Sequence, residues 1–194
     1  MNSSLVLTAL LALCSAQVVA PSEQAGLIDF RNKEQSKGWS AVNDGVMGGR
    51  SVGKLSRSDD SGMSFFGTLS LKNNGGFTSI RSGRMNIEMA PEDGFRIRLK
   101  GDGRTYICNL YPKTRRMAFS YRASLPTVAG QWTEVVVSLN DFTPTSFGRR
   151  VQDKGPLSPD QIGGIGFMLS DKKPGAFKLE IEWVKVEQPS AEDK

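Results

Sequence analysis

Hydrophobic and polar residues alternate along much of this chain, in short runs separated by Gly, Asn, Asp and Pro. The clearest case is residues 94–111, GFRIRLKGDGRTYICNLY, where apolar residues take every second position on both sides of a Gly-Asp-Gly break. A period of two puts one face of a strand in a hydrophobic core and the other face in water. Because Gly and Asp between two alternating runs favour a tight turn, we predict that residues 95–100 and 104–111 form an antiparallel hairpin at the centre of the fold.

The same pattern predicts short strands along the rest of the chain and no long helix. Their spacing of roughly 8–12 residues, with turn residues between them, is typical of an all-β sandwich or barrel. In the last strand, the adjacent apolar residues Trp183 and Val184 break the alternation, which indicates a β-bulge. The predicted strands are 27–30, 39–42, 53–57, 63–71, 77–82, 85–89, 95–100, 104–111, 117–125, 132–139, 162–169 and 176–186.

The two ends of the chain lack this alternation. Residues 1–20 contain an apolar run at 5–16 that is followed by small residues and is shorter than the ~20 residues that span a bilayer, which is the layout of a signal peptide. We therefore expect an exported protein, periplasmic or secreted, with no membrane span once this leader is removed. A mitochondrial location is disfavoured, because the first 30 residues contain no arginine. The remaining boundaries that we expect are a linker at 21–26, a single β-sandwich domain at 27–187 and a disordered tail at 188–194.

Side-chain chemistry narrows the function. The sequence contains no histidine, which excludes Ser-His-Asp and Cys-His catalysis and histidine metal sites. Cys108 is the one cysteine outside the leader, and it alternates inward with its apolar neighbours, so we assign it to the core and not to a nucleophile. No pair of carboxylates stands out in the sequence as a catalytic dyad, which would need two carboxyl groups facing each other across a cleft. We predict a protein that is not an enzyme and that has no cofactor and no metal site.

The charge of the chain leaves two interpretations open. Twenty-five Lys and Arg against 20 Asp and Glu give a net charge of +5, and the excess is concentrated in residues 96–122 and 149–154. Such a basic stretch is either a solvated strand face or an electrostatic patch for an acidic protein or a glycan. Nucleic acid is not an expected partner, because the charge is modest.

Glycines mark the predicted turns. Residues 48–54, GGRSVGK, match the spacing of a phosphate-binding loop, but Leu55 follows where Mg²⁺ coordination needs Ser or Thr, and a strand follows where a helix is needed. We therefore interpret these glycines as turn residues that provide positive φ or close backbone approach. The glycines to which we assign this role are Gly48, Gly49, Gly75, Gly76, Gly101 and Gly103.

A set of short motifs occurs in a fixed order along the chain. The motifs are Trp39 with 43–51 (NDGVMGGRS), Phe66-Gly67, 74–77 (NGGF) with Ser79 and Arg81, Arg98 with 101–104 (GDGR) and Tyr106, Trp132, Phe142 with Pro144, 164–166 (GIG), and 171–181. This ordered set resembles the complex I intermediate-associated protein 30 family. The resemblance implies a jelly-roll β-sandwich of two antiparallel sheets, similar to galactose-binding domains. It also implies a non-enzymatic role, since the mitochondrial members of that family help to assemble respiratory complex I.

Candidate binding residues come from these motifs. They are Asp44, Arg81, Arg98, Asp102, Arg104, Tyr106 and Trp132. Asp102 and Arg104 either face a ligand or fix a turn. Two functions remain open. The first is a binding or assembly module in which Arg81, Arg98 and Arg104, with neighbouring aromatic residues, hold an acidic protein partner or assembly intermediate. The second is a carbohydrate-binding module of an exported protein, in which a tryptophan at the rim stacks on a sugar.

Overall fold

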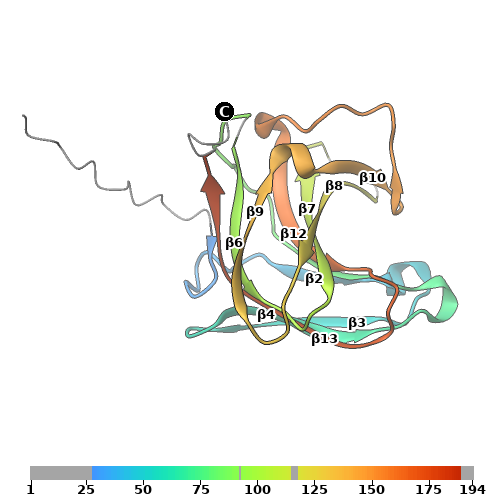
Figure 1. The fold of residues 1–194 in the computed structure, drawn as a ribbon. Helices are drawn as coiled ribbons and strands as arrows, with labels where there is room; N and C mark the ends of the chain where they lie inside the picture. The colour runs from blue at the N-terminus through green and yellow to red at the C-terminus, as the bar shows by residue number, and fades with distance from the viewer. Residues whose placement is uncertain (1–27, 92, 115–117, 189–194) are drawn as a thin grey trace, which may run out of the picture.

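Two antiparallel sheets pack face to face in the computed structural model, which describes residues 28–91, 93–114 and 118–188 (Figure 1). The only helices among these residues are short 3₁₀ segments. The predicted class, an all-β sandwich of two antiparallel sheets, is therefore confirmed. The predicted leader at 1–20 and linker at 21–26 lie outside the described residues, as does the predicted tail apart from Gln188.

The first sheet, here called sheet A, has the strand order β3-β4-β13-β6-β9, with β1 paired to β13. Its strands are β1 (Ile28–Asp29), β3 (Val52–Ser58), β4 (Gly62–Leu69), β6 (Gly94–Lys100), β9 (Trp132–Ser138) and β13 (Gly175–Glu187). The second, sheet B, has the order β11-β10-β8-β7-β12-β5-β2. Its strands are β2 (Ser40–Asn43), β5 (Thr78–Arg81), β7 (Thr105–Pro112), β8 (Phe119–Pro126), β10 (Thr143–Ser146), β11 (Arg149–Arg150) and β12 (Ile162–Leu169). The 3₁₀ helices are η1 (Asp44–Met47), η2 (Lys72–Asn74), η3 (Leu139–Asp141) and η4 (Pro159–Gln161).

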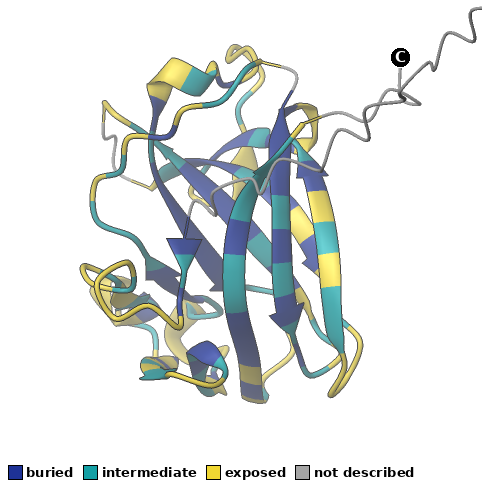
Figure 2. Cartoon of the chain, turned by 90° about the vertical axis from the view of Figure 1, so that its left-hand side faces the viewer, coloured by how far each residue is buried: buried dark blue, intermediate teal, exposed yellow. Residues whose placement is uncertain are grey.

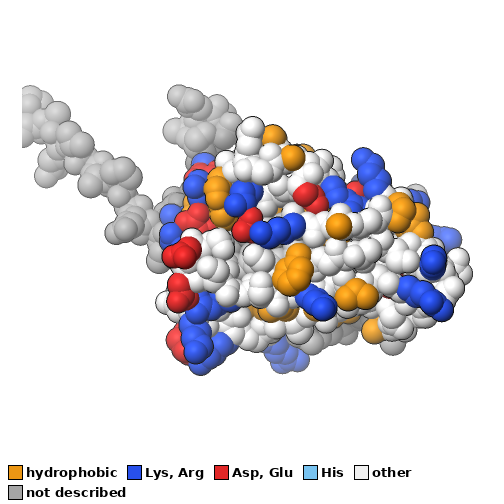
Figure 3. Space-filling model, turned by 90° about the horizontal axis from the view of Figure 1, so that it is seen from below, with side chains coloured by type: hydrophobic (Ala, Val, Ile, Leu, Met, Phe, Trp, Pro, Cys, Tyr) orange, Lys and Arg blue, Asp and Glu red, His pale blue; other side chains and the backbone are white. Residues whose placement is uncertain are grey.

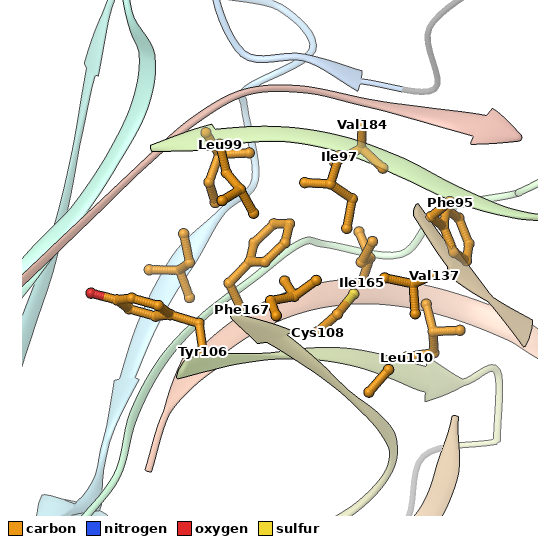
Figure 4. Close-up of a cluster of buried hydrophobic side chains, with 14 of the residues drawn as sticks. Phe95, Ile97, Leu99, Tyr106, Cys108, Leu110, Val137, Ile165, Phe167 and Val184 are labelled. Carbon is orange, nitrogen blue, oxygen red and sulfur yellow. The ribbon is translucent and has the colours of Figure 1, made fainter. Parts of the chain in front are cut away.

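The core lies between the sheets and follows the alternation of the sequence. Phe95, Ile97 and Leu99 of β6 are fully buried, and they face Tyr106 and Cys108 of β7 across the sandwich (Figure 4). Buried and partly exposed bands alternate along the long strands (Figure 2). Each of the two sheets therefore has an outer face, and polar side chains lie on these two faces.

The predicted hairpin of β6 and β7 is wrong. β6 pairs with β13 and β9 in sheet A, whereas β7 pairs with β12 and β8 in sheet B. The Gly-Asp-Gly segment instead carries the chain from one sheet to the other. Thr127 fixes it there, because its hydroxyl accepts a hydrogen bond from the Gly103 N–H and donates one to the Arg104 carbonyl. Alternation identifies the buried face of a strand but not its partner, so a hairpin and a crossing between layers have the same pattern.

Two smaller differences and one confirmed prediction concern single elements. Residues 85–89 do not form the predicted strand, although Met85 and Met89 still pack against the core. Strands β10 and β11 were not predicted, because they are short and polar and β10 contains a proline. The predicted bulge in β13 is confirmed, since the register with β6 shifts between Ile181 and Trp183.

Candidate functional site

Asp44 is the first residue of η1, directly after β2, and is only 1 % exposed. Its carboxylate accepts hydrogen bonds from the Ser51 N–H at 2.8 Å, the Ser51 hydroxyl at 2.6 Å, the Gly76 N–H at 2.7 Å and the Phe77 N–H at 3.3 Å. Burial opposes ionisation, but these hydrogen bonds outweigh it and lower the pKa of Asp44. These donors come from the segment that ends at Ser51 and from Gly76 and Phe77, so the buried Asp44 carboxylate joins two loops of the fold.

The glycine-rich loops close around this carboxylate. A Cβ atom on Gly49 would lie 2.3 Å from the Asp44 Cγ, and one on Gly75 would lie 2.6 Å from the Asp44 Oδ2. Side chains at these two positions would therefore displace the acid. Among the other glycines assigned to turns, three have a positive φ, and a Cβ on the fourth would collide with Thr127. Those three are Gly48, Gly76 and Gly103, and the fourth is Gly101.

Asp102, Arg104 and Tyr106 come together at the crossing from β6 to β7. The Asp102 carboxylate accepts hydrogen bonds from the Tyr106 hydroxyl at 3.1 Å and from the Lys178 N–H at 2.9 Å. Arg104 forms a bidentate pair with Asp171 at 2.9 and 2.7 Å. It also donates to the backbone carbonyls of Lys173, just before β13, and of Ala176, at the start of β13. Burial raises the pKa of Tyr106 far above its usual value. These groups satisfy one another, and they tie the crossing to the β12–β13 loop.

Arg98 and Trp132 lie together on the outer face of sheet A. The Arg98 guanidinium carbon is 5.4 Å from the centre of the Trp132 ring, and the Lys100 ammonium is 5.0 Å from it. Arg98 also donates to Glu182 at 2.6 Å and lies 3.6 Å from Glu134. Carboxylates of the same sheet therefore neutralise Arg98, and its ion pairs continue along β6 and β13 through further Arg–Glu and Lys–Glu contacts.

A shallow hollow of about 580 Å³ lies on the same outer face, over β3, β4 and β13. Figure 3, which views the molecule from this side, shows hydrophobic side chains in the middle of the face with basic side chains around them. The side chains that line the hollow include Val52, Lys54, Phe66, Thr68 and Lys178. None of the residues predicted as a binding site belongs to it.

The outer face of sheet B has a different character. Its seven strands contain four arginines and no aspartate or glutamate. Arg81 of β5 and Arg122 of β8 lie in one cross-strand row, in which Gly166 and Asn109 stand between them. The Arg81 guanidinium carbon is 5.0 Å from the centre of the Tyr111 ring. We call Arg81, Asn109, Tyr111 and Arg122 the Arg81–Arg122 cluster.

The arginines of this cluster are held in the same way. The Nε atom of each donates to the hydroxyl of the serine two residues earlier in its strand, at 3.2 Å for Arg81 with Ser79 and 3.3 Å for Arg122 with Ser120. Neither arginine pairs with a carboxylate among the described residues. Burial lowers the pKa of Arg122 from its ordinary value, and the nearby charge of Arg81 adds to this effect.

Two further members of the cluster have unused hydrogen-bonding capacity. The amide Nδ2 of Asn109 and the hydroxyl of Tyr111 are buried and have no partner within the described part of the chain. Ser120 donates to the other amide atom of Asn109, its Oδ1. Among the predicted binding residues only Arg81 belongs to the cluster; Asn109, Tyr111 and Arg122 were not predicted from the sequence. The repeated Ser-x-Arg pattern at 79–81 and 120–122, on the outward positions of two strands, is the signal that could have found Arg122.

Other kinds of site have little support in the part of the chain that the structure describes. No group of three or more His, Cys, Asp and Glu residues is placed there to hold a metal ion. Cys108 is fully buried, and burial raises the pKa of its thiol well above the ordinary value. Within the same residues, no helix has the length and apolar character needed to cross a membrane.

Solved structures define the class of fold. The family 11 carbohydrate-binding module of a cellulosomal cellulase from Clostridium thermocellum has a TM-score of 0.61 and 13 % sequence identity, and the match covers 86 % of this chain and 95 % of that one. An agarase matches with a TM-score of 0.57 over 86 % of this chain and 25 % of the enzyme, at 12 % identity. At such identities the likeness concerns the fold alone, which is the predicted jelly-roll sandwich of the galactose-binding-domain type.

The chain belongs to the complex I intermediate-associated protein 30 family, whose model matches residues 28–181. The mouse protein named complex I intermediate-associated protein 30, mitochondrial, is 31 % identical over 186 residues, which cover 84 % of this chain and 56 % of the mouse protein. The Neurospora crassa protein of the same name is 27 % identical over 101 residues, 52 % of this chain and 36 % of that protein. This chain therefore spans about half the length, or less, of these two curated relatives.

These names correct one expectation. Both relatives are named mitochondrial, so our expectation that the protein is exported, with a mitochondrial location disfavoured, is wrong. That expectation depended on the apolar run at 5–16 and on the lack of arginine near it, and both lie outside the residues that the family model matches.

Proposed function

We propose that the chain is a non-catalytic binding module that holds a protein partner or intermediate during the assembly of respiratory complex I. Family membership and the names of the relatives support the assembly role. The observation that carries the binding role is the Arg81–Arg122 cluster. Among the described residues, its two arginines have no carboxylate partner, and two buried polar groups, Asn109 Nδ2 and the Tyr111 hydroxyl, have no hydrogen-bond partner.

The contrast between the two outer faces supports sheet B as the binding surface. On sheet A, Arg96 and Arg98 both lie against glutamates of the same sheet, so a partner would have to compete with existing ion pairs. On sheet B, Arg81 and Arg122 form no ion pair with any carboxylate in the described part of the chain, so no such competition exists there. Unpaired charge and unmade hydrogen bonds in a partly buried site carry a free-energy cost, which an acidic partner would remove.

The test is the capture of named complex I subunits. The tagged full chain is added to a mitochondrial extract of its native host, and bound proteins are identified by mass spectrometry. We expect complex I subunits with the wild-type chain and their loss with the double variant Arg81→Gln and Arg122→Gln. The matched control is Arg149→Gln with Arg150→Gln, which removes the same charge from exposed positions of the same sheet. Failure of the wild-type chain to capture complex I subunits would contradict the proposal.

The carbohydrate-binding alternative depends on Trp132. This residue is partly exposed on sheet A, whereas Trp39 stacks on Phe167 and packs against the core. The cationic groups of Arg98 and Lys100 already lie against the Trp132 ring, where a sugar would have to stack. The carbohydrate-binding function therefore has weaker support. It predicts a change of tryptophan fluorescence on titration with millimolar β-glucan oligosaccharide, and that change would disappear in the variant Trp132→Ala.

A further inference from the structure

We infer that the Arg81–Arg122 cluster is a carboxylate-binding site that takes an Asp or Glu side chain from an acidic segment of the partner. This inference rests on the proposed function, because it names the chemistry that the protein partner must present. It also assigns the recognition of the partner to one site, the Arg81–Arg122 cluster, and not to the whole outer face of sheet B.

The arrangement of the strands builds the site. Arg81 and Arg122 are three strand spacings apart in one row, roughly 14 Å between backbones, with Gly166 and Asn109 between them. Gly166 has no side chain, and a Cβ there would lie 3.1 Å from the Cε2 atom of Tyr111. The glycine therefore gives the Tyr111 ring room to lie against β12, with the Arg81 guanidinium near the ring.

The unused groups of the cluster are mainly hydrogen-bond donors. Nδ2 of Asn109 and the Nη atoms of the two arginines can only donate, and the Tyr111 hydroxyl can donate as well. Ser120 accepts from Arg122 and donates to Oδ1 of Asn109, so the amide Nδ2 is the atom left without a partner. A group that satisfies several donors beside two positive charges must be an anion with more than one acceptor oxygen.

Arginine geometry favours a carboxylate as this anion. The planar guanidinium donates two parallel hydrogen bonds that match the two oxygens of a carboxylate. The same chain already uses this pairing, because Arg104 holds Asp171 through two such bonds. The guanidinium groups of Arg81 and Arg122 are each anchored by one hydrogen bond to a serine, which leaves them free to turn outward and admit the ligand to the buried donors.

The experiment measures the affinity of the purified full chain for a fluorescein-labelled peptide that carries three glutamates. The same peptide with glutamines is the ligand control. We expect saturable binding of the glutamate peptide, weakened about tenfold or more by Arg81→Gln or by Arg122→Gln and about threefold by Tyr111→Phe, which removes only the hydroxyl. Arg149→Gln, an exposed arginine of the same sheet, should change the affinity less than about twofold.

Several results would overturn the inference. These are equal binding of the glutamine peptide, no loss of affinity in the two arginine variants, or displacement by inorganic phosphate at lower concentration than by acetate. Melting temperatures identify a variant that fails to fold, and Tyr111→Phe then serves as the milder test. Capture of complex I subunits without binding of the glutamate peptide would reject the carboxylate site alone. Binding of the peptide without capture of those subunits would reject the assembly role alone.

Discussion

Asp44 accepts four hydrogen bonds from its own chain, whereas Arg81 donates one and has no carboxylate partner among the described residues. Both residues occur in the motifs that characterise the family, so motif membership does not separate structural from binding roles. The two roles differ in how many hydrogen bonds each side chain already makes within the fold. On that count Asp44 and Arg104 hold the fold together, and Arg81 is the residue that we propose for ligand binding.

At Asp44 we predict a large loss of stability on Asp44→Asn. The amide nitrogen would face backbone N–H groups that now donate to a carboxylate, so the free energy of unfolding should fall by about 2–4 kcal/mol. Chemical denaturation measures this change, and Asp60→Asn, which removes the same charge from an exposed turn, is the control. Equal denaturation midpoints for the two variants would refute the structural role of Asp44.

The lowered pKa of Asp44 makes its contribution dependent on pH. Because the folded-state pKa lies below the unfolded value of about 3.9, the contribution is present above that pH and is lost as the pH falls through the folded-state pKa. The wild-type chain should therefore lose stability in acid more steeply than the Asp44→Asn variant. Parallel stability curves below pH 4 would show that Asp44 is not the group responsible.

At the scale of elements, the segment that crosses from β6 to β7 helps to fix the position of one sheet relative to the other. Arg104 and Asp171 fasten this crossing to the loop before β13, and both side chains are largely buried. The pair therefore joins two segments that are distant in sequence, and each of these segments connects one sheet with the other. Breaking it should loosen the end of the sandwich without changing the strand order.

We predict that Arg104→Gln and Asp171→Asn each lower the free energy of unfolding by about 2–4 kcal/mol, because each leaves a buried charge without its partner. The double variant should cost less than the sum, with a coupling of about 1 kcal/mol or more. Lys37→Gln, which breaks an exposed ion pair with Glu34, should have almost no effect. Additive losses in the Arg104–Asp171 cycle would contradict the proposed coupling.

The sequence predicted which residues of each element are buried but not which strands pair. Phe95 and Tyr106 were correctly placed in the core, because period-two alternation reports burial directly. Their strands were wrongly joined, since the Gly-Asp-Gly crossing depends on Thr127, a residue distant in sequence.

The same limit applies to the site. Arg98 and Arg81 look alike in sequence, and only the pairing of strands shows that Arg98 lies against Glu182 while Arg81 lies near Tyr111. The pattern of a single strand contains no information about the charge on its neighbours. Arg122 and Asn109 were missed for this reason, because their significance depends on the row that they share with Arg81.

The whole molecule has two outer faces with different electrostatics. The strands of sheet A combine basic residues with five carboxylates, and most of these charges form ion pairs. The strands of sheet B contain arginines without carboxylates. The central claim is that sheet B, and not the paired face or the hollow of sheet A, contacts the assembly partner.

Site-specific photo-crosslinking tests this claim most directly. A benzophenone amino acid replaces Ser124, which is exposed two residues from Arg122 on the outer face of sheet B, or Thr68, which is exposed beside the hollow of sheet A. Irradiation in mitochondrial extract, followed by mass spectrometry, identifies the crosslinked protein. We expect a complex I subunit crosslinked from position 124 and none from position 68. Crosslinks from position 68 alone would contradict the account.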